Sequence, residues 1–139
     1  MKRIAELQPL SHDHHHALVL ANRCTKMAAS GDAAASVNLW QDVIDEFIHN
    51  LLPHFHIEEQ TLIAPLRRLG EDRLLSQLLE EHGLIKACVF NTQTPKSQLL
   101  MRFGELLAAH VRFEERELFV TVQDRFTPQE QQRILERRV

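Results

Sequence analysis

Apolar residues recur every three or four positions along most of the chain, which is the spacing of one face of an amphipathic helix. Gly and Pro interrupt this pattern, and no alternation typical of strands replaces it. The interruptions separate four long periodic segments and a short fifth one. We therefore expect helices at about residues 11–29, 34–64, 74–89, 99–122 and 128–137.

Local signals refine these boundaries. Ser11 is a candidate N-cap of the first helix, and residues 127–130 read Thr-Pro-Gln-Glu, a capping box with Pro at the first helical position. Pro53 lies within the second helix, where it removes one backbone hydrogen bond and is expected to bend the helix. Pro65 and Gly70 are expected to mark the connection that follows.

Short connections between long helices favour neighbours that run in opposite directions. The predicted fold is all-α, an antiparallel up-down-up-down four-helix bundle of about residues 11–124, followed by a short C-terminal helix at about 128–137. At 139 residues the chain is long enough for one domain with a sizeable core, and we expect a single domain over residues 1–139.

One pattern of side chains occurs twice, in the second and fourth predicted helices. Residues four apart lie on the same helical face, so each His and its following Glu can point at one ion. Flanking Leu residues place these polar groups inside a core, where an unpaired carboxylate costs several kcal/mol. The two copies are Leu51-x-x-His54-x-x-x-Glu58-Glu59-x-x-Leu62 and Leu107-x-x-His110-x-x-x-Glu114-Glu115-x-x-Leu118.

The other two long helices can complete a metal site. The first contains four histidines within residues 12–16, and the third contains His82 on its apolar side. One imidazole from each would give four imidazoles and two carboxylates, a set suited to two iron or manganese ions in a bundle core. Zinc is less favoured, because Cys24 and Cys88 form no Cys-x-x-Cys unit. A buried His–Glu network without metal is the alternative.

Composition excludes several other classes. A net charge of −3 with scattered Lys and Arg gives no basic stripe for nucleic acid. No apolar run approaches the roughly 18 residues of a membrane span, and the N-terminus lacks the apolar segment of a signal peptide. Cys24 and Cys88 are expected to be inert buried thiols. We expect a cytoplasmic protein without a nucleic-acid or membrane partner.

Several phrases together resemble the hemerythrin-like, or HHE cation-binding, domain over about residues 8–124. They are Asp13-His14-His15, Pro53-His54-Phe55, and Phe113-Glu114-Glu115-Arg116-x-Leu118-Phe119, combined with the repeated His-x-x-x-Glu-Glu. The resemblance implies two iron ions with an oxo or hydroxo bridge, with manganese or zinc less favoured. The implied metal ligands are His15, His54, Glu58, His82, His110 and Glu114.

Two of these assignments have alternatives. His15 is preferred because it precedes Leu18 by three positions, as the resemblance implies, and its stripe continues through Leu18 and Val19; His14 remains the alternative. Glu114 is preferred to Glu115 because its distance from the preceding His matches that of Glu58.

Four further histidine and glutamate positions are expected to lie outside the preferred ligand set. Glu59 should face solvent or support a ligand from outside, as should Glu115 if it is not a ligand. His49 and His56 lie off the ligand stripe of the second helix and should be exposed.

The resemblance also orders the possible functions. Oxygen-carrying hemerythrins have a second His four residues before the one at His82, where this chain has Leu78, so one iron should keep an open position for oxygen, nitric oxide or azide. We expect a protein that binds or senses such a small oxidant. The alternatives are a di-iron enzyme of oxidative or nitrosative stress defence or iron-sulfur cluster repair, or an iron-handling bundle.

Three features favour binding over catalysis. The repair proteins carry paired cysteines in an N-terminal segment, and no Cys precedes Ser11. The chain has no Tyr for radical chemistry, and no nucleophile–base pair is visible apart from the metal centre.

Overall fold

The structure, a computed structural model, describes residues 2–138, and every regular element among them is a helix. This confirms the prediction of an all-α fold. The α-helices are α1 (Gln8–Ser30), α2 (Ala33–Glu46), α3 (Leu52–Arg68), α4 (Asp72–Val89), α5 (Lys96–Phe113), α6 (Phe119–Arg125) and α7 (Pro128–Arg138). Two π-helical turns, η1 (Phe47–Leu51) and η2 (Glu114–Leu118), join α2 to α3 and α5 to α6.

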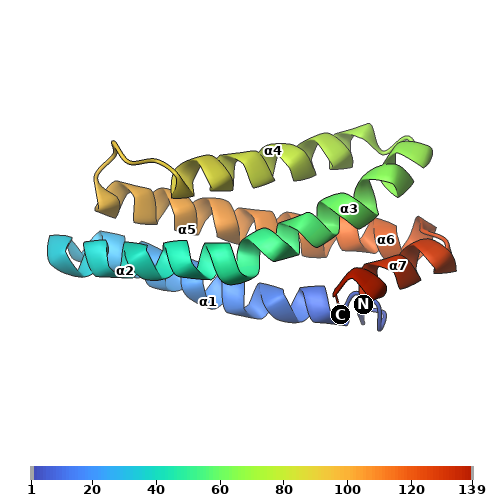
Figure 1. The fold of residues 1–139 in the computed structure, drawn as a ribbon, viewed down its shortest axis with the longest axis horizontal. Helices are drawn as coiled ribbons and strands as arrows, with labels where there is room; N and C mark the ends of the chain where they lie inside the picture. Colours follow the sequence, from blue (N-terminus) through green and yellow to red (C-terminus); the bar gives the residue numbers. More distant parts are fainter. Residues whose placement is uncertain (1, 139) are drawn as a thin grey trace.

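These elements form a helical bundle of four long rods, which are α1, the continuous α2–η1–α3, α4, and the continuous α5–η2–α6 (Figure 1). The contact between α1 and α5 is the most extensive, and α4 packs against both α3 and α5. The short α7 lies across one end of the bundle against α3 (Figure 1).

The first helix begins earlier than predicted. It starts at Gln8, with Leu7 in the N-cap position and Pro9 in the first turn, so the prediction of Ser11 as N-cap is wrong. Leu7 and Leu10 are fully buried, and this apolar packing extends the helix towards the N-terminus. The Ser11 hydroxyl instead donates a hydrogen bond to Glu115. Gly31, at φ +72°, ends α1 in the left-handed conformation.

The two prolines of the second rod have different effects. Pro53 stands in the first turn of α3, directly after η1, so the expected disturbance takes the form of a π-helical turn. Pro65 lies inside α3, which continues to Arg68, so the prediction that the connection begins at Pro65 is wrong. Leu62 and Leu66 are fully buried on either side of Pro65, and their packing holds the last turn together.

The predicted capping box of the last helix is confirmed. The backbone N–H of Glu130 donates to Thr127 Oγ1 at 3.1 Å, and the N–H of Thr127 donates to Glu130 Oε1 at 2.9 Å. Arg68 of α3 also donates to both oxygens of Glu130, which fastens α7 to α3.

The core consists of two apolar clusters separated along the rods. One contains Phe47, Phe55, Trp40, Ile85 and Phe103 with their neighbours. The other contains Leu10, Leu62, Leu78, Phe119 and Ile134 with theirs. On every rod a buried polar position falls between the members of the two clusters. The bundle therefore encloses a polar layer between two apolar ones.

Gly104 allows α1 and α5 to approach closely. A Cβ atom at this position would lie 2.7 Å from the carbonyl oxygen of Ala21 and 2.7 Å from Thr25 Cγ2. Cys24 of α1 and Cys88 of α4 are both buried and free, as predicted, and burial raises the pKa of the Cys24 thiol to about 12.

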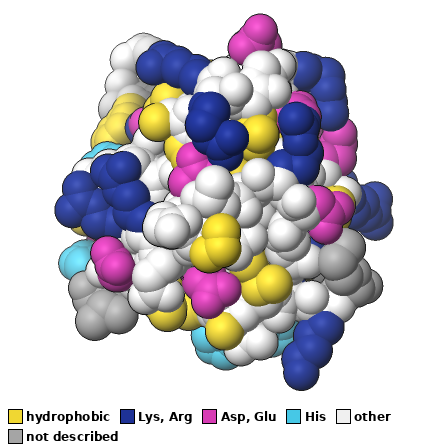
Figure 2. All heavy atoms as spheres, turned by 90° about the vertical axis from the view of Figure 1, so that its right-hand side faces the viewer, with side chains coloured by type: hydrophobic (Ala, Val, Ile, Leu, Met, Phe, Trp, Pro, Cys, Tyr) yellow, Lys and Arg dark blue, Asp and Glu magenta, His cyan; other side chains and the backbone are white. Residues whose placement is uncertain are grey.

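Basic, acidic and apolar side chains are interspersed on the surface at the α7 end of the bundle, and no large patch of one charge forms there among the described residues (Figure 2). Exposed ion pairs of the molecule include Arg68–Glu130 and Arg73–Glu117. Within residues 2–138, none of the helices combines the length and apolar character that crossing a membrane requires.

Candidate metal centre

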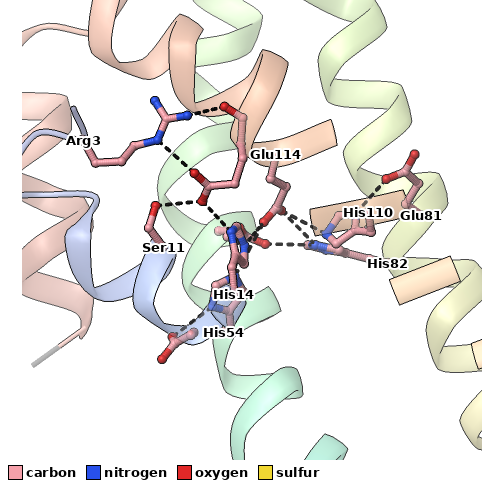
Figure 3. Close-up of polar contacts among 11 residues, drawn as sticks. Arg3, Ser11, His14, His54, Glu81, His82, His110 and Glu114 are labelled. Atoms are coloured by element: carbon pink, nitrogen blue, oxygen red, sulfur yellow. Dashed lines mark hydrogen bonds and ion pairs between the residues drawn. The ribbon is translucent and has the colours of Figure 1, made fainter. Parts of the chain in front are cut away.

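Six side chains from the four rods meet in the polar layer (Figure 3). All six are buried, and Glu58 and Glu114 are fully so. The His-x-x-x-Glu spacing brings two of them from α3 and two from the α5–η2 rod, while α1 and α4 supply one each. They are His14, His54, Glu58, His82, His110 and Glu114.

The six residues divide into two groups of four potential ligands. One group is His14, His54, Glu58 and Glu114, and we call it subsite A. The other is His82, His110, Glu58 and Glu114, and we call it subsite B. Within each group, ligand atoms of all four residues lie within 4.8 Å of one another. Both carboxylates are common to the two subsites.

The oxygens of each shared carboxylate point to different subsites. Glu58 Oε2 lies 3.1 Å from His54 Nε2, and its Oε1 lies 3.0 Å from His82 Nε2. Glu114 Oε1 lies 2.7 Å from His14 Nε2, and its Oε2 lies 3.0 Å from His110 Nε2. This is the arrangement in which two carboxylates can bridge two metal ions.

Each imidazole turns Nε2 towards the centre and Nδ1 towards a carboxylate outside it. The four Nδ1–oxygen distances are His14–Glu115 2.6 Å, His54–Asp13 3.0 Å, His82–Glu59 2.7 Å and His110–Glu81 2.7 Å. A carboxylate on one ring nitrogen fixes the ring orientation and makes the other nitrogen a stronger metal ligand. We call Asp13, Glu59, Glu81 and Glu115 the outer carboxylates.

The carboxylates favour protonated imidazoles in the absence of metal. Burial lowers the pKa of His14, but hydrogen bonds to Glu114 and Glu115 outweigh it and raise the pKa to about 9. Burial also lowers the pKa values of His82 and His110. At His82, contacts with Glu114 and Glu58 help outweigh burial and raise the pKa to about 10. At His110, the contact with Glu114 helps raise the pKa to about 9. Burial raises the pKa of Glu114, but the His110 charge and further imidazole contacts hold it well below its ordinary value.

Two buried polar atoms of the centre have no hydrogen-bond partner. His110 Nε2 and Glu114 Oε2 lie 3.0 Å apart, yet their orientation makes no hydrogen bond, and neither buried atom has another hydrogen-bond partner. Leaving buried polar atoms unsatisfied costs about 1–3 kcal/mol each. An imidazole nitrogen and a carboxylate oxygen aimed at the same space fit a metal ion, and the mixed nitrogen and oxygen set fits iron or manganese.

The structure corrects the ligand candidate on the first helix. His15 is exposed, whereas His14 is buried in the centre, so the expectation that His15 faces the core is wrong. The buried stripe of α1 runs through Leu10, His14, Ala17, Ala21 and Cys24, spaced by three and four. Leu18 and Val19, which had suggested the other face, are 40% and 50% exposed.

The other five predicted site residues are brought together in the centre. Glu114 rather than Glu115 points into it, while Glu59 and Glu115 support imidazoles from outside. His49 and His56 are exposed, as expected. Sequence reasoning did not assign the supporting roles of Asp13 and Glu81. Their signal was a carboxylate directly before His14 and another directly before His82.

Comparison with known proteins agrees with this geometry. The family model described as the hemerythrin HHE cation binding domain matches residues 6–122. Curated proteins and solved structures give no match to the chain. The family match covers most of the sequence and all six residues of the centre. The chain therefore belongs to the hemerythrin HHE cation-binding domain family.

Proposed function

We propose that this protein holds two iron ions and binds or senses a small oxidant such as oxygen or nitric oxide. In this proposal the rods form an antiparallel up-down-up-down bundle, which their short connections favour. The single observation that carries the proposal is the sharing of Glu58 and Glu114 by two groups of four ligands. When bound, iron would supply redox chemistry and open coordination positions for the small molecule.

The chain's own residues would hold and shield such a pair. His14 and His54 would bind one ion and His82 and His110 the other, with both carboxylates between them. The two apolar clusters on either side limit access of water to the polar layer. Leu78, fully buried one turn before His82, supplies no ligand atom, in keeping with an open position at subsite B.

Metal analysis combined with spectroscopy tests this function. We expect two iron ions per chain after anaerobic loading, and a changed visible spectrum when stoichiometric nitric oxide or oxygen is added. Zinc-loaded protein is the control, because zinc has no redox chemistry and should show no such change. Fewer than two irons per chain, or no spectral response, would contradict the proposal. Catalytic turnover of the added oxidant would favour the alternative of a di-iron enzyme.

The bridging role has its own variants. Glu58→Ala or Glu114→Ala removes a carboxylate common to both subsites, so each variant should lose at least one metal ion per chain. Glu117→Ala, which removes an exposed glutamate close in sequence, should keep both. Unchanged metal content in both Glu58→Ala and Glu114→Ala would contradict the bridging assignment.

A further inference from the structure

Residues 2–7 precede α1 and contact η2 through Arg3 and α6 through Ile4, and we call them the N-terminal strap. Its backbone is held where the N–H of Ile4 donates to Gln123 Oε1 at 3.0 Å and where the Leu7 side chain is fully buried. Arg3 reaches from the strap to Glu115, with Nε donating to Glu115 Oε1 at 3.0 Å and Nη2 donating to the Glu115 backbone oxygen (Figure 3). Arg3 of the strap thus donates hydrogen bonds to both the side chain and the backbone of Glu115.

Glu115 passes this contact on to the metal centre. Its other oxygen, Oε2, accepts from Ser11 Oγ at 2.7 Å and contacts His14 Nδ1 at 2.6 Å. The Arg3 guanidinium lies 5.8 Å from the centre of the Phe119 ring, on which the His14 ring also stacks at 5.2 Å. Arg3 and His14 are therefore linked through a shared carboxylate and a shared aromatic ring.

The supports of subsite B come from a different part of the molecule. Glu81, the partner of His110, receives a hydrogen bond from Gln77 at 2.9 Å, and Glu59, the partner of His82, has Lys86 at 3.7 Å. Gln77 and Lys86 both belong to α4. The partners of Glu59 and Glu81 at subsite B thus lie on a long helix. Glu115, the partner of His14 at subsite A, is held by Ser11 of α1 and also by Arg3, which lies outside the rods.

We propose that Arg3 is a positioning residue for subsite A, so that the strap controls how tightly one of the two metal ions is held. This inference rests on the proposed di-metal function. The planar fork of arginine holds Glu115 at two points. Without it, Glu115, whose side chain is 30% exposed, keeps only Ser11 besides His14 as a hydrogen-bond partner, and the His14 ring is held less firmly. Removing the carboxylate partner of a metal-bound histidine typically weakens metal binding about 10–100-fold. Arg3 acts one contact further out, through Glu115, so its removal should have a smaller effect.

Anaerobic titration with ferrous iron tests the inference. In Arg3→Ala we expect one site with wild-type affinity and one that is weakened about 10-fold, the lower end of the range for loss of a ligand's direct partner. Arg3→Lys keeps the positive charge but lacks the planar fork, so the iron affinity of its weakened site should lie between those of wild type and Arg3→Ala. Arg68→Ala is the matched control. It also removes an arginine paired with a glutamate, but its partner Glu130 contacts none of the residues of the centre. Equal weakening of both sites, or two unchanged sites, in Arg3→Ala would overturn the inference.

A second measurement needs no metal. In the metal-free protein, the short contact between His14 Nδ1 and Glu115 should give a strongly downfield ring N–H proton in the NMR spectrum. This signal should shift or disappear in Arg3→Ala and in Glu115→Gln, and persist in Arg68→Ala. An unchanged signal in Arg3→Ala would overturn the positioning role of Arg3. Failure of wild-type protein to bind two irons would instead overturn the proposed function.

Discussion

At the scale of single residues, the centre is built from imidazoles that use both ring nitrogens. In the described part of the chain, each of the four faces the centre with Nε2 and an outer carboxylate with Nδ1. The arrangement keeps each ring in place whether a proton or a metal ion occupies Nε2. Substitutions in this layer should therefore distinguish the histidines that face the centre from adjacent histidines that do not.

Adjacent histidines of α1 offer such a comparison. His14→Ala removes a ligand of subsite A and should lower its iron affinity by more than the roughly 10-fold expected for an outer partner. His15→Ala changes an exposed side chain and should leave both sites intact. Iron content and titration of the two purified variants check this. Loss of iron in His15→Ala with normal binding in His14→Ala would reverse the assignment.

The sequence could not decide between these histidines by itself. Neighbouring residues on a helix point about 100° apart, so the choice depends on which face packs against the other rods. The His-x-x-x-Glu pairs had no such ambiguity, because each is a pair on one face flanked by Leu. In α1 the deciding contact is with α5, where Gly104 lets Ala21 and Thr25 approach. That contact is a tertiary feature.

Leu78 tests whether a position next to the centre is open. Leu78→His would place an imidazole one turn before His82, in a fully buried position, and should fill the open coordination position. We expect weaker azide binding or a shifted charge-transfer spectrum, with both irons retained. Leu79→His changes the neighbouring, partly exposed residue and serves as the control. Identical azide affinity and spectra at equal iron content would show that residue 78 does not face the centre.

At the scale of elements, the π-helical turn η2 distinguishes the two copies of the repeated pattern. In the first copy the π-helical turn precedes His54, and in the second it begins at Glu114. Despite this difference, consecutive glutamates contact the two nitrogens of one ring in both copies: Glu58 and Glu59 contact His82, and Glu114 and Glu115 contact His14. Spacing predicted the helices and the inward glutamates. It could not predict the wider turns, because an inserted π-helical turn leaves the residue pattern unchanged.

Replacing two helical glycines with alanine should change the free energy of unfolding in opposite directions, because only one of them lies at the close contact of α1 and α5. Gly104→Ala places a methyl group 2.7 Å from the Ala21 oxygen and should lower the free energy of unfolding by about 1–3 kcal/mol. Gly83→Ala in α4 meets no atom within 4 Å and should raise it by roughly 0.5–1 kcal/mol. Urea unfolding of the metal-free variants measures both. A Gly104→Ala protein as stable as wild type would show that the two rods can move apart freely.

At the scale of the whole molecule, the polar layer couples stability to pH. The pKa values of His14 and His110 are raised from 6.5 to about 9, and that of His82 to about 10. A raised pKa stabilises the folded state fully below the unfolded value of 6.5, and this contribution disappears as pH rises through 9 to 10. The metal-free protein should therefore lose stability over this range. Denaturant unfolding of the metal-free protein at pH 6.5 and at about pH 10 measures this loss of stability.

Two comparisons make that prediction specific. His82→Gln removes one of the titrating groups, so the loss of stability with rising pH should be smaller in this variant. Iron binding should show the opposite trend, because each ion must displace protons from the imidazoles and its apparent affinity should rise with pH. Stability of the metal-free protein that increases from pH 6.5 upwards would contradict the protonated state of the centre.

The origin of the ligands also affects how the chain assembles. They span positions 14 to 114 and come from all four rods, so no single hairpin of the bundle contains a complete subsite. A metal ion would then bind tightly only after all four rods have packed together, and by mass action its binding would favour the complete bundle over every partly folded form. A bound metal ion would therefore mark protein in which folding is complete.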